Sequence, residues 1–209
     1  MNSKVTHINV GNLAENCWFL ANEDTKEAVA IDPGAEPDRI CAAAEKHGWK
    51  ITAILLTHGH IDHMGACESL RTELGVKVYA LTEEEDLLLD AKKNLSVFIE
   101  RKVVTFEPDE LLRDGQELTL AGMKIQVIHT PGHTPGGCSY YVAEAGCVFS
   151  GDTLFAESVG RSDFPGGSTS ALVRAVKEKL FLLPDDTLVC PGHGEETTIG
   201  HEKKYNSFV

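Results

Sequence analysis

The sequence lacks the features that direct a chain to a membrane, an export pathway or a nucleic acid. No apolar run reaches the roughly 18–20 residues that a membrane span needs, and the start, MNSKVTHINVGN, is too polar for a signal peptide. Basic residues are scarce, since 19 Lys and Arg stand against 32 Asp and Glu, for a formal net charge of −13. Nucleic-acid and membrane-surface binding need clustered basic residues. We therefore expect a cytoplasmic protein with no nucleic-acid or membrane partner, and the oligomeric state stays open.

The chain also lacks the cysteine spacing of a disulfide framework or a thiolate metal site. Its cysteines are Cys17, Cys41, Cys67, Cys138, Cys147 and Cys190, and none forms a C-x-x-C pair. Without an export signal, free and mostly buried thiols are the expectation. Cys67 and Cys190 lie near histidine-containing segments, so we treat them as neighbours of a site and not as ligands.

What the chain does have is the make-up of one globular domain, residues 1–209, because 42% of its residues are hydrophobic. Apolar patterning and turn residues predict both strands and helices along the chain. The expected strands are 4–10, 16–21, 27–32, 51–57, 77–81, 116–120, 124–130, 138–143, 147–150 and 187–190. The expected helices are 37–47, 62–74, 83–90 and 168–182. Many connections are too short for parallel crossovers, which favours antiparallel or mixed sheets with helices outside.

The stretch AILLTHGHIDHMGA, residues 53–66, concentrates titratable groups after an apolar run. His58, His60, Asp62 and His63 fall within six positions. An isolated H-x-H could be two hydrogen-bonded core residues on one strand face. Here Gly59 and the helix start make the segment a turn, and four such groups packed together without a counter-ion would compete for partners. The stretch therefore predicts a metal site.

Three later segments repeat the same arrangement of a strand, a glycine-containing turn and a ligand-type side chain. They are HTPGHTPG with His133, FSGDTLF with Asp152, and VCPGHGE with His193. Imidazole and carboxylate suit zinc, iron(II) or manganese. The five histidines and two aspartates exceed the needs of one tetrahedral site. They suffice for two adjacent ions that share a carboxylate.

In that order, THGHIDH, PGHTPG, GDTLF and PGHG resemble the metallo-β-lactamase superfamily, over essentially the whole chain. The resemblance implies an α/β (α+β) fold, an αββα four-layer sandwich of two mixed sheets flanked by helices, with the metals at one edge between the sheets. Carried over by motif position, it implies that His58, His60 and His133 bind a first metal. It likewise implies that Asp62, His63 and His193 bind a second metal, with Asp152 bridging the two.

Within the superfamily, GRSDFPGG after GDTLF and TTIGHEKKYN after His193 resemble a short subgroup of glyoxalase II-like hydrolases. Larger members carry an additional C-terminal helical domain that binds glutathione, which we do not expect here. The implied function is a thioester hydrolase that acts on a small acyl thioester with two divalent ions, zinc being expected and iron or manganese the alternatives. Such a pair can lower the pKa of bound water toward roughly 7. A thiolate, with a pKa of about 8.5, leaves with little acid catalysis. Asp62 could also orient the attacking water.

A competing interpretation is a persulfide dioxygenase, a class that shares GRSDF-like residues but uses one iron. There His58, His133 and Asp152 would form a triad of two histidines and a carboxylate, with positions open for oxygen and substrate.

Several other residues have two interpretations each. Asp32 in AIDPG is either a carboxylate that holds a ligand histidine or a turn residue. Arg161 and Asp163 either contact substrate or form a structural ion pair. His129 is interpreted as a hydrogen-bonded core residue and His47 as a helix-end residue, while His7 and His201 have no motif support.

Overall fold

The computed structural model describes residues 2–209, and two six-stranded sheets form its centre. The first sheet runs in the order β1-β2-β3-β4-β5-β6. Its first three strands are antiparallel neighbours, whereas β3 to β6 are parallel, so the sheet is mixed. The strands are β1 (Ser3–Val10), β2 (Glu15–Asn22), β3 (Glu27–Ile31), β4 (Lys50–Leu55), β5 (Lys77–Leu81) and β6 (Glu110–Leu112).

The second sheet runs in the order β14-β13-β10-β9-β8-β7 and is also mixed, because only β10 and β13 are parallel. A two-stranded ribbon, β11 (Leu154–Phe155) and β12 (Ser158–Val159), follows β10. The sheet's strands are β7 (Glu117–Leu120), β8 (Met123–His129), β9 (Cys138–Val142), β10 (Cys147–Gly151), β13 (Leu188–Pro191) and β14 (Thr197–Thr198).

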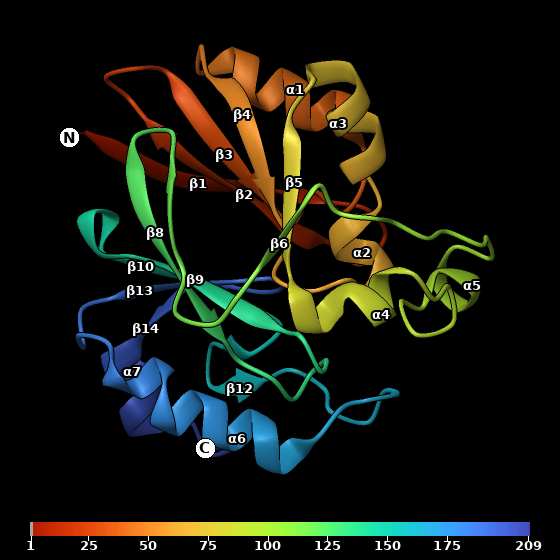
Figure 1. Ribbon diagram of the computed structural model, residues 1–209. Coiled ribbons are helices and arrows are strands. Elements are labelled where there is room, and N and C mark those ends of the chain that lie inside the picture. The colour runs from red at the N-terminus through yellow and green to blue at the C-terminus, as the bar shows by residue number, and fades with distance from the viewer. Residues whose placement is uncertain (1) are drawn as a thin grey trace.

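Helices cover the outer faces of both sheets, which confirms the predicted αββα sandwich (Figure 1). Helices α1 and α3 lie outside the first sheet, and α6 and α7 lie outside the second. The helices are α1 (Pro37–Lys46), α2 (Ile61–Met64), α3 (Cys67–Leu74), α4 (Glu85–Leu88), α5 (Ser96–Ile99), α6 (Thr169–Glu178) and α7 (Ile199–Tyr205), with 3₁₀ turns η1 (Thr82–Glu84), η2 (Ala143–Ala145) and η3 (Leu180–Leu182). Within residues 2–209, no helix is long and apolar enough to cross a membrane.

One predicted helix, 62–74, is wrong as a single element, because the chain divides it into α2 and α3. The break falls at Gly65 and Ala66, where the Ala66 amide donates to the carbonyl of Pro33 at 2.9 Å. A Cβ on Gly65 would lie 2.3 Å from the carbonyl oxygen of Gly34. The chain at residues 65 and 66 therefore packs closely against Pro33 and Gly34, and this contact interrupts the helix.

The facing surfaces of the two sheets pack against each other with apolar side chains. Trp18, Leu20 and Leu55 from the first sheet share one buried cluster with Val127 and Phe149 from the second. Burial of such surface supplies about 25 cal/mol per Å² and is the main force that holds the layers together. All six cysteines are free, and five of them are buried, as expected.

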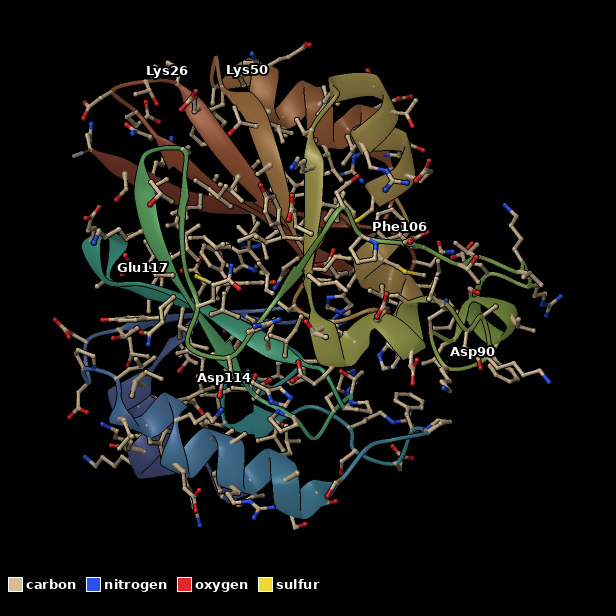
Figure 2. The ribbon with its side chains drawn as sticks, viewed as in Figure 1. Lys26, Lys50, Asp90, Phe106, Asp114 and Glu117 are labelled. Carbon is tan, nitrogen blue, oxygen red and sulfur yellow. The ribbon has the colours of Figure 1, made fainter. Side chains whose placement is uncertain are left out.

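The two ends of the parallel strands in the first sheet carry different side chains, and each end is here called an edge of the sandwich. Lys26 and Lys50 mark the edge where β3 and β4 begin, far from α4 (Figure 2). The carboxyl ends of β3 and β4 lie at the opposite edge, and Asp32 and His58 follow them there. Loops with polar side chains therefore gather at this second edge.

Candidate metal centre

All seven residues predicted as ligands lie in loops or a short helix that follow strands of the two sheets. His58 and His60 lie between β4 and α2, and Asp62 and His63 lie in α2. His133 follows β8, Asp152 follows β10 and His193 follows β13. The structure brings these residues together from both halves of the sandwich.

The first ligand group contains His58, His60 and His133. Their donor nitrogens all lie within 4.8 Å of one another. His60 Nδ1 is 2.9 Å from His133 Nε2, and the three side chains are buried. Three imidazoles at this spacing are typical of a zinc or iron site with an open position.

The second ligand group contains Asp62, His63 and His193, whose donor atoms also lie within 4.8 Å of one another. Asp62 Oδ2 is 3.3 Å from His193 Nε2 and 3.9 Å from His63 Nε2. His63 is fully buried, whereas the side chains of Asp62 and His193 are 16% and 27% exposed. The second group therefore has the more open side.

Asp152 lies between the two groups. Its Oδ1 is 3.4 Å from His63 Nε2 in the second group, and its Oδ2 is 3.5 Å from His133 Nε2 in the first. One oxygen thus faces each group. A carboxylate in this position could bridge two ions, and its Oδ2 also lies 3.9 Å from His193 Nε2 in the second group.

The donor set fits a cation because its key atoms have no other partner. His58 Nε2, His63 Nε2 and Asp152 Oδ1 are buried and make no hydrogen bond within the described chain. A buried polar atom without a partner costs about 1–3 kcal/mol. Metal coordination at these atoms would remove that cost.

The hydrogen bonds of Nδ1 in His58 and His63 determine which tautomer the neutral form of each ring adopts. Asp32 Oδ2 accepts from the Thr57 hydroxyl at 2.5 Å and lies 3.1 Å from His63 Nδ1. A carboxylate only accepts, so His63 Nδ1 donates. His58 Nδ1 lies 3.1 Å from Thr57 Oγ1, whose proton is already directed to Asp32, and it therefore donates to Thr57. In its neutral form, each imidazole thus presents an Nε2 lone pair to the site.

His133 is oriented in the same way by the backbone. Its Nδ1 lies 2.7 Å from the carbonyl oxygen of Arg161, so Nδ1 donates and Nε2 is left as the acceptor. Asp32, for which the sequence left two interpretations, also accepts from the Thr57 amide at 2.7 Å. It is buried behind His63, and its position is that of a carboxylate that fixes a ligand histidine.

The electrostatics of the metal-free site favour ligand protonation states at three of the residues. Burial and the neighbouring histidines lower the pKa of His58 and His60 well below the usual range. Burial opposes ionisation of Asp62, but His63 and His193 outweigh it and lower the pKa of Asp62. Neutral imidazole and ionised carboxylate are the forms that bind metal.

His63 is the exception. Burial acts to lower its pKa, but the carboxylates of Asp152, Asp62 and Asp32 outweigh burial and raise the pKa of His63 well above the usual range. Without a metal, a proton is therefore held among these carboxylates. A cation at the second group would take its place.

Three further residues lie close to the site, and two of them, Asn16 and Trp18, support it; no motif reveals them in the sequence. The side-chain amide of Asn16 donates to the carbonyls of Pro191 and Gly194 at 3.0 Å each, and the Trp18 indole donates to Pro191 at 2.8 Å. These bonds hold the loop that carries His193. Glu15 is fully buried, with Oε1 3.9 Å from His63 Nδ1. Only long-range contacts give these residues their roles.

The remaining candidates lie outside the two ligand groups. His129 Nε2 is 2.8 Å from the carbonyl of Pro135, and His47 ends α1 and stacks on Trp49. Arg161 and Asp163 form an exposed, two-bond ion pair with both N–O distances 2.9 Å. The Arg161 guanidinium also lies 4.3 Å from the centre of the Phe164 ring, which approaches His60 and His133 edge-on. The segment 161–164 therefore borders the first group.

A cavity of about 260 Å³ adjoins Asp62. Its wall includes Leu13 from the β1–β2 hairpin, Ile61 from α2, and Ile99 and Val104 from the segment around α5. Lys102 and two glutamates, Glu36 and Glu100, add charge at the wall. The cavity is mixed in character and large enough for a small acyl group.

Comparison with known proteins agrees with this geometry. The profile of the Metallo-beta-lactamase superfamily matches residues 10–193. The probable metallo-hydrolase YqgX of Bacillus subtilis is 39% identical over 201 residues, 96% of this chain and 94% of YqgX. The hydroxyacylglutathione hydrolase GloC of Haemophilus influenzae is 36% identical over 197 residues, 93% of this chain and 92% of GloC.

Solved structures resemble the whole sandwich. The BLEG-1 B3 metallo-beta-lactamase superposes with a TM-score of 0.93 at 38% identity, over 98% of this chain and 99% of BLEG-1. TTHA1623 in a di-iron-bound form gives 0.86 at 37%, over 98% and 100% of the two chains. ETHE1 from Myxococcus xanthus gives 0.78 at 30%, over 99% and 84%. With its profile match, its relatives and its seven clustered ligand-type residues, the chain belongs to the metallo-beta-lactamase superfamily.

Proposed function

We propose that the protein is a metal-dependent thioester hydrolase of the glyoxalase II type that acts on small acyl thioesters. The observation that carries the proposal is the position of Asp152, with one carboxylate oxygen toward each ligand group. Two divalent ions held by these groups would lower the pKa of water and polarise a carbonyl. Zinc is the metal we propose, with iron or manganese as alternatives.

The residues around the site have distinct proposed roles. Asp62 is both a ligand and, because its side chain is partly exposed, the group that orients the attacking water. Asp32 and Thr57 hold His58 and His63 in the tautomer that leaves Nε2 free. The cavity beside Asp62 takes the acyl group.

The acid groups near the site favour a thioester over an ordinary ester or amide. Glu15 and Asp32, the carboxyl groups next to His63, are fully or nearly fully buried behind it and cannot reach a leaving group. These two carboxyl groups therefore cannot protonate the leaving group, which favours a group that departs with little proton donation. A thiolate, whose pKa is about 8.5, meets that condition. The similarity to GloC at 36% identity supports the same class of substrate.

The experiment combines metal analysis with a substrate panel. Protein made in its own host would be analysed for metal. It would then be assayed with lactoylglutathione, with lactoyl thioesters of shorter thiols and with a β-lactam. The β-lactam is included because the similar structure BLEG-1 is a B3 metallo-beta-lactamase. We expect two ions per chain and release of free thiol. Retention of thiol release by Asp152→Ala protein at the wild-type rate would contradict the proposed centre.

A mononuclear iron persulfide dioxygenase is the second candidate. The GRSDF segment, residues 160–164, favours it, because persulfide dioxygenases share residues of this kind. The complete second group of Asp62, His63 and His193 favours the hydrolase. One iron per chain, with oxygen uptake on a persulfide and no thiol release from thioesters, would replace the hydrolase proposal.

A further inference from the structure

Glu84 is a buried carboxylate beside the first ligand group that is not itself one of the predicted ligands. It lies in the 3₁₀ turn η1, directly after β5, and is only 1% exposed. Its Oε1 accepts a hydrogen bond from the Gly59 amide at 2.9 Å, and its Oε2 accepts one from the Gly136 amide at 2.8 Å. Both carboxylate oxygens are therefore used, each by a different loop.

The two amides belong to the two loops that carry the first ligand group. Gly59 lies between His58 and His60, and Gly136 is the third residue after His133. The first loop follows β4 in one sheet, and the second follows β8 in the other. One carboxylate thus ties together two loops from opposite sheets of the sandwich. Hydrogen bonds to a charged acceptor are about twice as strong as neutral ones.

Packing restricts the space for a side chain at both glycines, most severely at Gly136, which meets backbone atoms. A Cβ on Gly136 would lie 2.2 Å from the backbone nitrogen of Glu84, and one on Gly59 would lie 2.6 Å from Leu88 Cδ2. Gly136 therefore allows its loop to approach the turn that carries Glu84, and Gly59 allows its loop to pack against α4. Burial raises the pKa of Glu84 to about 7. The hydrogen bonds from Gly59 and Gly136 act in the opposite direction on this pKa, because they favour the charged carboxylate that accepts them.

We propose that Glu84 is a positioning residue that sets the spacing of the first ligand group by holding its two loops on one carboxylate. The second group has different supports, Asp32 at His63 and Asn16 at the loop of His193. Loss of the Glu84 contacts should therefore loosen His58, His60 and His133 selectively. The inference rests on the proposed metal centre and not on the identity of the substrate.

The variant Glu84→Gln tests the proposal with little change in shape. A carboxylate accepts at both oxygens, whereas a side-chain amide has one acceptor and one donor group. The N–H₂ group of glutamine would then face one of the two backbone N–H groups. Two donors cannot form a hydrogen bond, so that loop would lose its contact. Glu83→Gln is the matched control, because Glu83 is the exposed neighbour and the change in charge is the same.

The measurement is zinc affinity of metal-free protein, with each ligand group isolated. In a His193→Ala background, which impairs the second group, we expect Glu84→Gln to weaken zinc binding about 10- to 100-fold, the usual cost of losing an outer support. In a His60→Ala background, which impairs the first group, we expect Glu84→Gln protein to have the same zinc affinity as the Glu83→Gln control. Equal weakening in both backgrounds, or in neither, would overturn the proposal. Absence of zinc binding by wild-type protein would instead overturn the metal centre.

A second measurement needs no variant and covers a Glu84→Gln protein that fails to fold. In metal-free wild-type protein, the Gly59 and Gly136 amides should exchange hydrogen slowly, because both are bonded to a buried carboxylate. Exchange of either amide at the rate of an exposed loop amide would contradict the role of Glu84.

Discussion

Replacement of Asp32 by asparagine removes one charge behind His63 of the second ligand group, beside Thr57, which also contacts His58 of the first group. Asp32 accepts from the Thr57 amide, from the Thr57 hydroxyl and from His63 Nδ1. Asparagine keeps the shape but offers one acceptor oxygen and one N–H₂ group. If the oxygen stays on the Thr57 amide, the N–H₂ faces His63 Nδ1. The reverse orientation sets N–H₂ against the Thr57 amide instead.

The first orientation changes the tautomer of His63. Its Nδ1 must then accept, which moves the ring proton to Nε2, the atom that lies 3.4 Å from Asp152. A neutral hydrogen bond of about 0.5–1.5 kcal/mol would replace a charged one of about 1.5–3 kcal/mol. The difference, about 1–2 kcal/mol, is close to the 10- to 100-fold loss of metal affinity expected for an outer support. We therefore expect the second group to lose affinity by about that factor.

The assay is zinc titration of metal-free Asp32→Asn protein in the His60→Ala background, where the second group is measured by itself. Asp38→Asn is the control, since Asp38 is exposed on α1 and loses the same charge. The tautomer argument would be refuted if Asp32→Asn and Asp38→Asn protein had equal zinc affinity. The contact between the asparagine N–H₂ group and His63 Nδ1 would then have no effect on metal binding.

Three other predictions address the bridge, the fold and the pH response. Asp152→Ala should lose metal from both groups, whereas His193→Ala should lose it mainly from one, and full occupancy of Asp152→Ala by elemental analysis would exclude bridging. Gly136→Ala should lower the free energy of unfolding by about 1–3 kcal/mol, the usual cost of overpacking, since its Cβ would meet the Glu84 backbone; an unchanged denaturant midpoint would contradict this. Burial raises the folded-state pKa of Glu84 from 4.5 to about 7, so its protonated form stabilises the fold below pH 4.5, and this contribution is lost as the pH rises to 7. Metal-free wild-type protein should therefore lose stability over that window relative to Glu84→Gln protein. The measurement is the free energy of unfolding of both proteins at pH 5 and pH 8. A difference between the two proteins that is the same at both pH values would contradict the prediction.

The sequence predicts those parts of the site that depend on short motifs. His58, His60 and His63 are recognisable because they are close in sequence, and the strand-turn pattern places His133, Asp152 and His193 at the same edge of the fold. The αββα sandwich follows from the same motifs. The supporting residues are different, because Glu84 and Gly136 are 52 positions apart and Asn16 and Pro191 are 175 apart. Nothing local marks such contacts.

Secondary structure shows the same division between local and long-range causes. The helix expected at 62–74 has a suitable composition, yet contact between Gly65 and Gly34 divides it. The short strands β6 and β14 were not predicted, since three and two residues carry no periodicity of their own. They exist because a neighbouring strand offers free backbone groups.

The distribution of ligands between the two sheets has a consequence for synthesis of the protein. Each ligand group takes residues from both halves, so a nascent chain that ends before residue 133 holds neither group complete. The second group is finished only when His193 has left the ribosome. The second group can therefore reach its proposed coordination only late in synthesis, after all three members of the first group have been made.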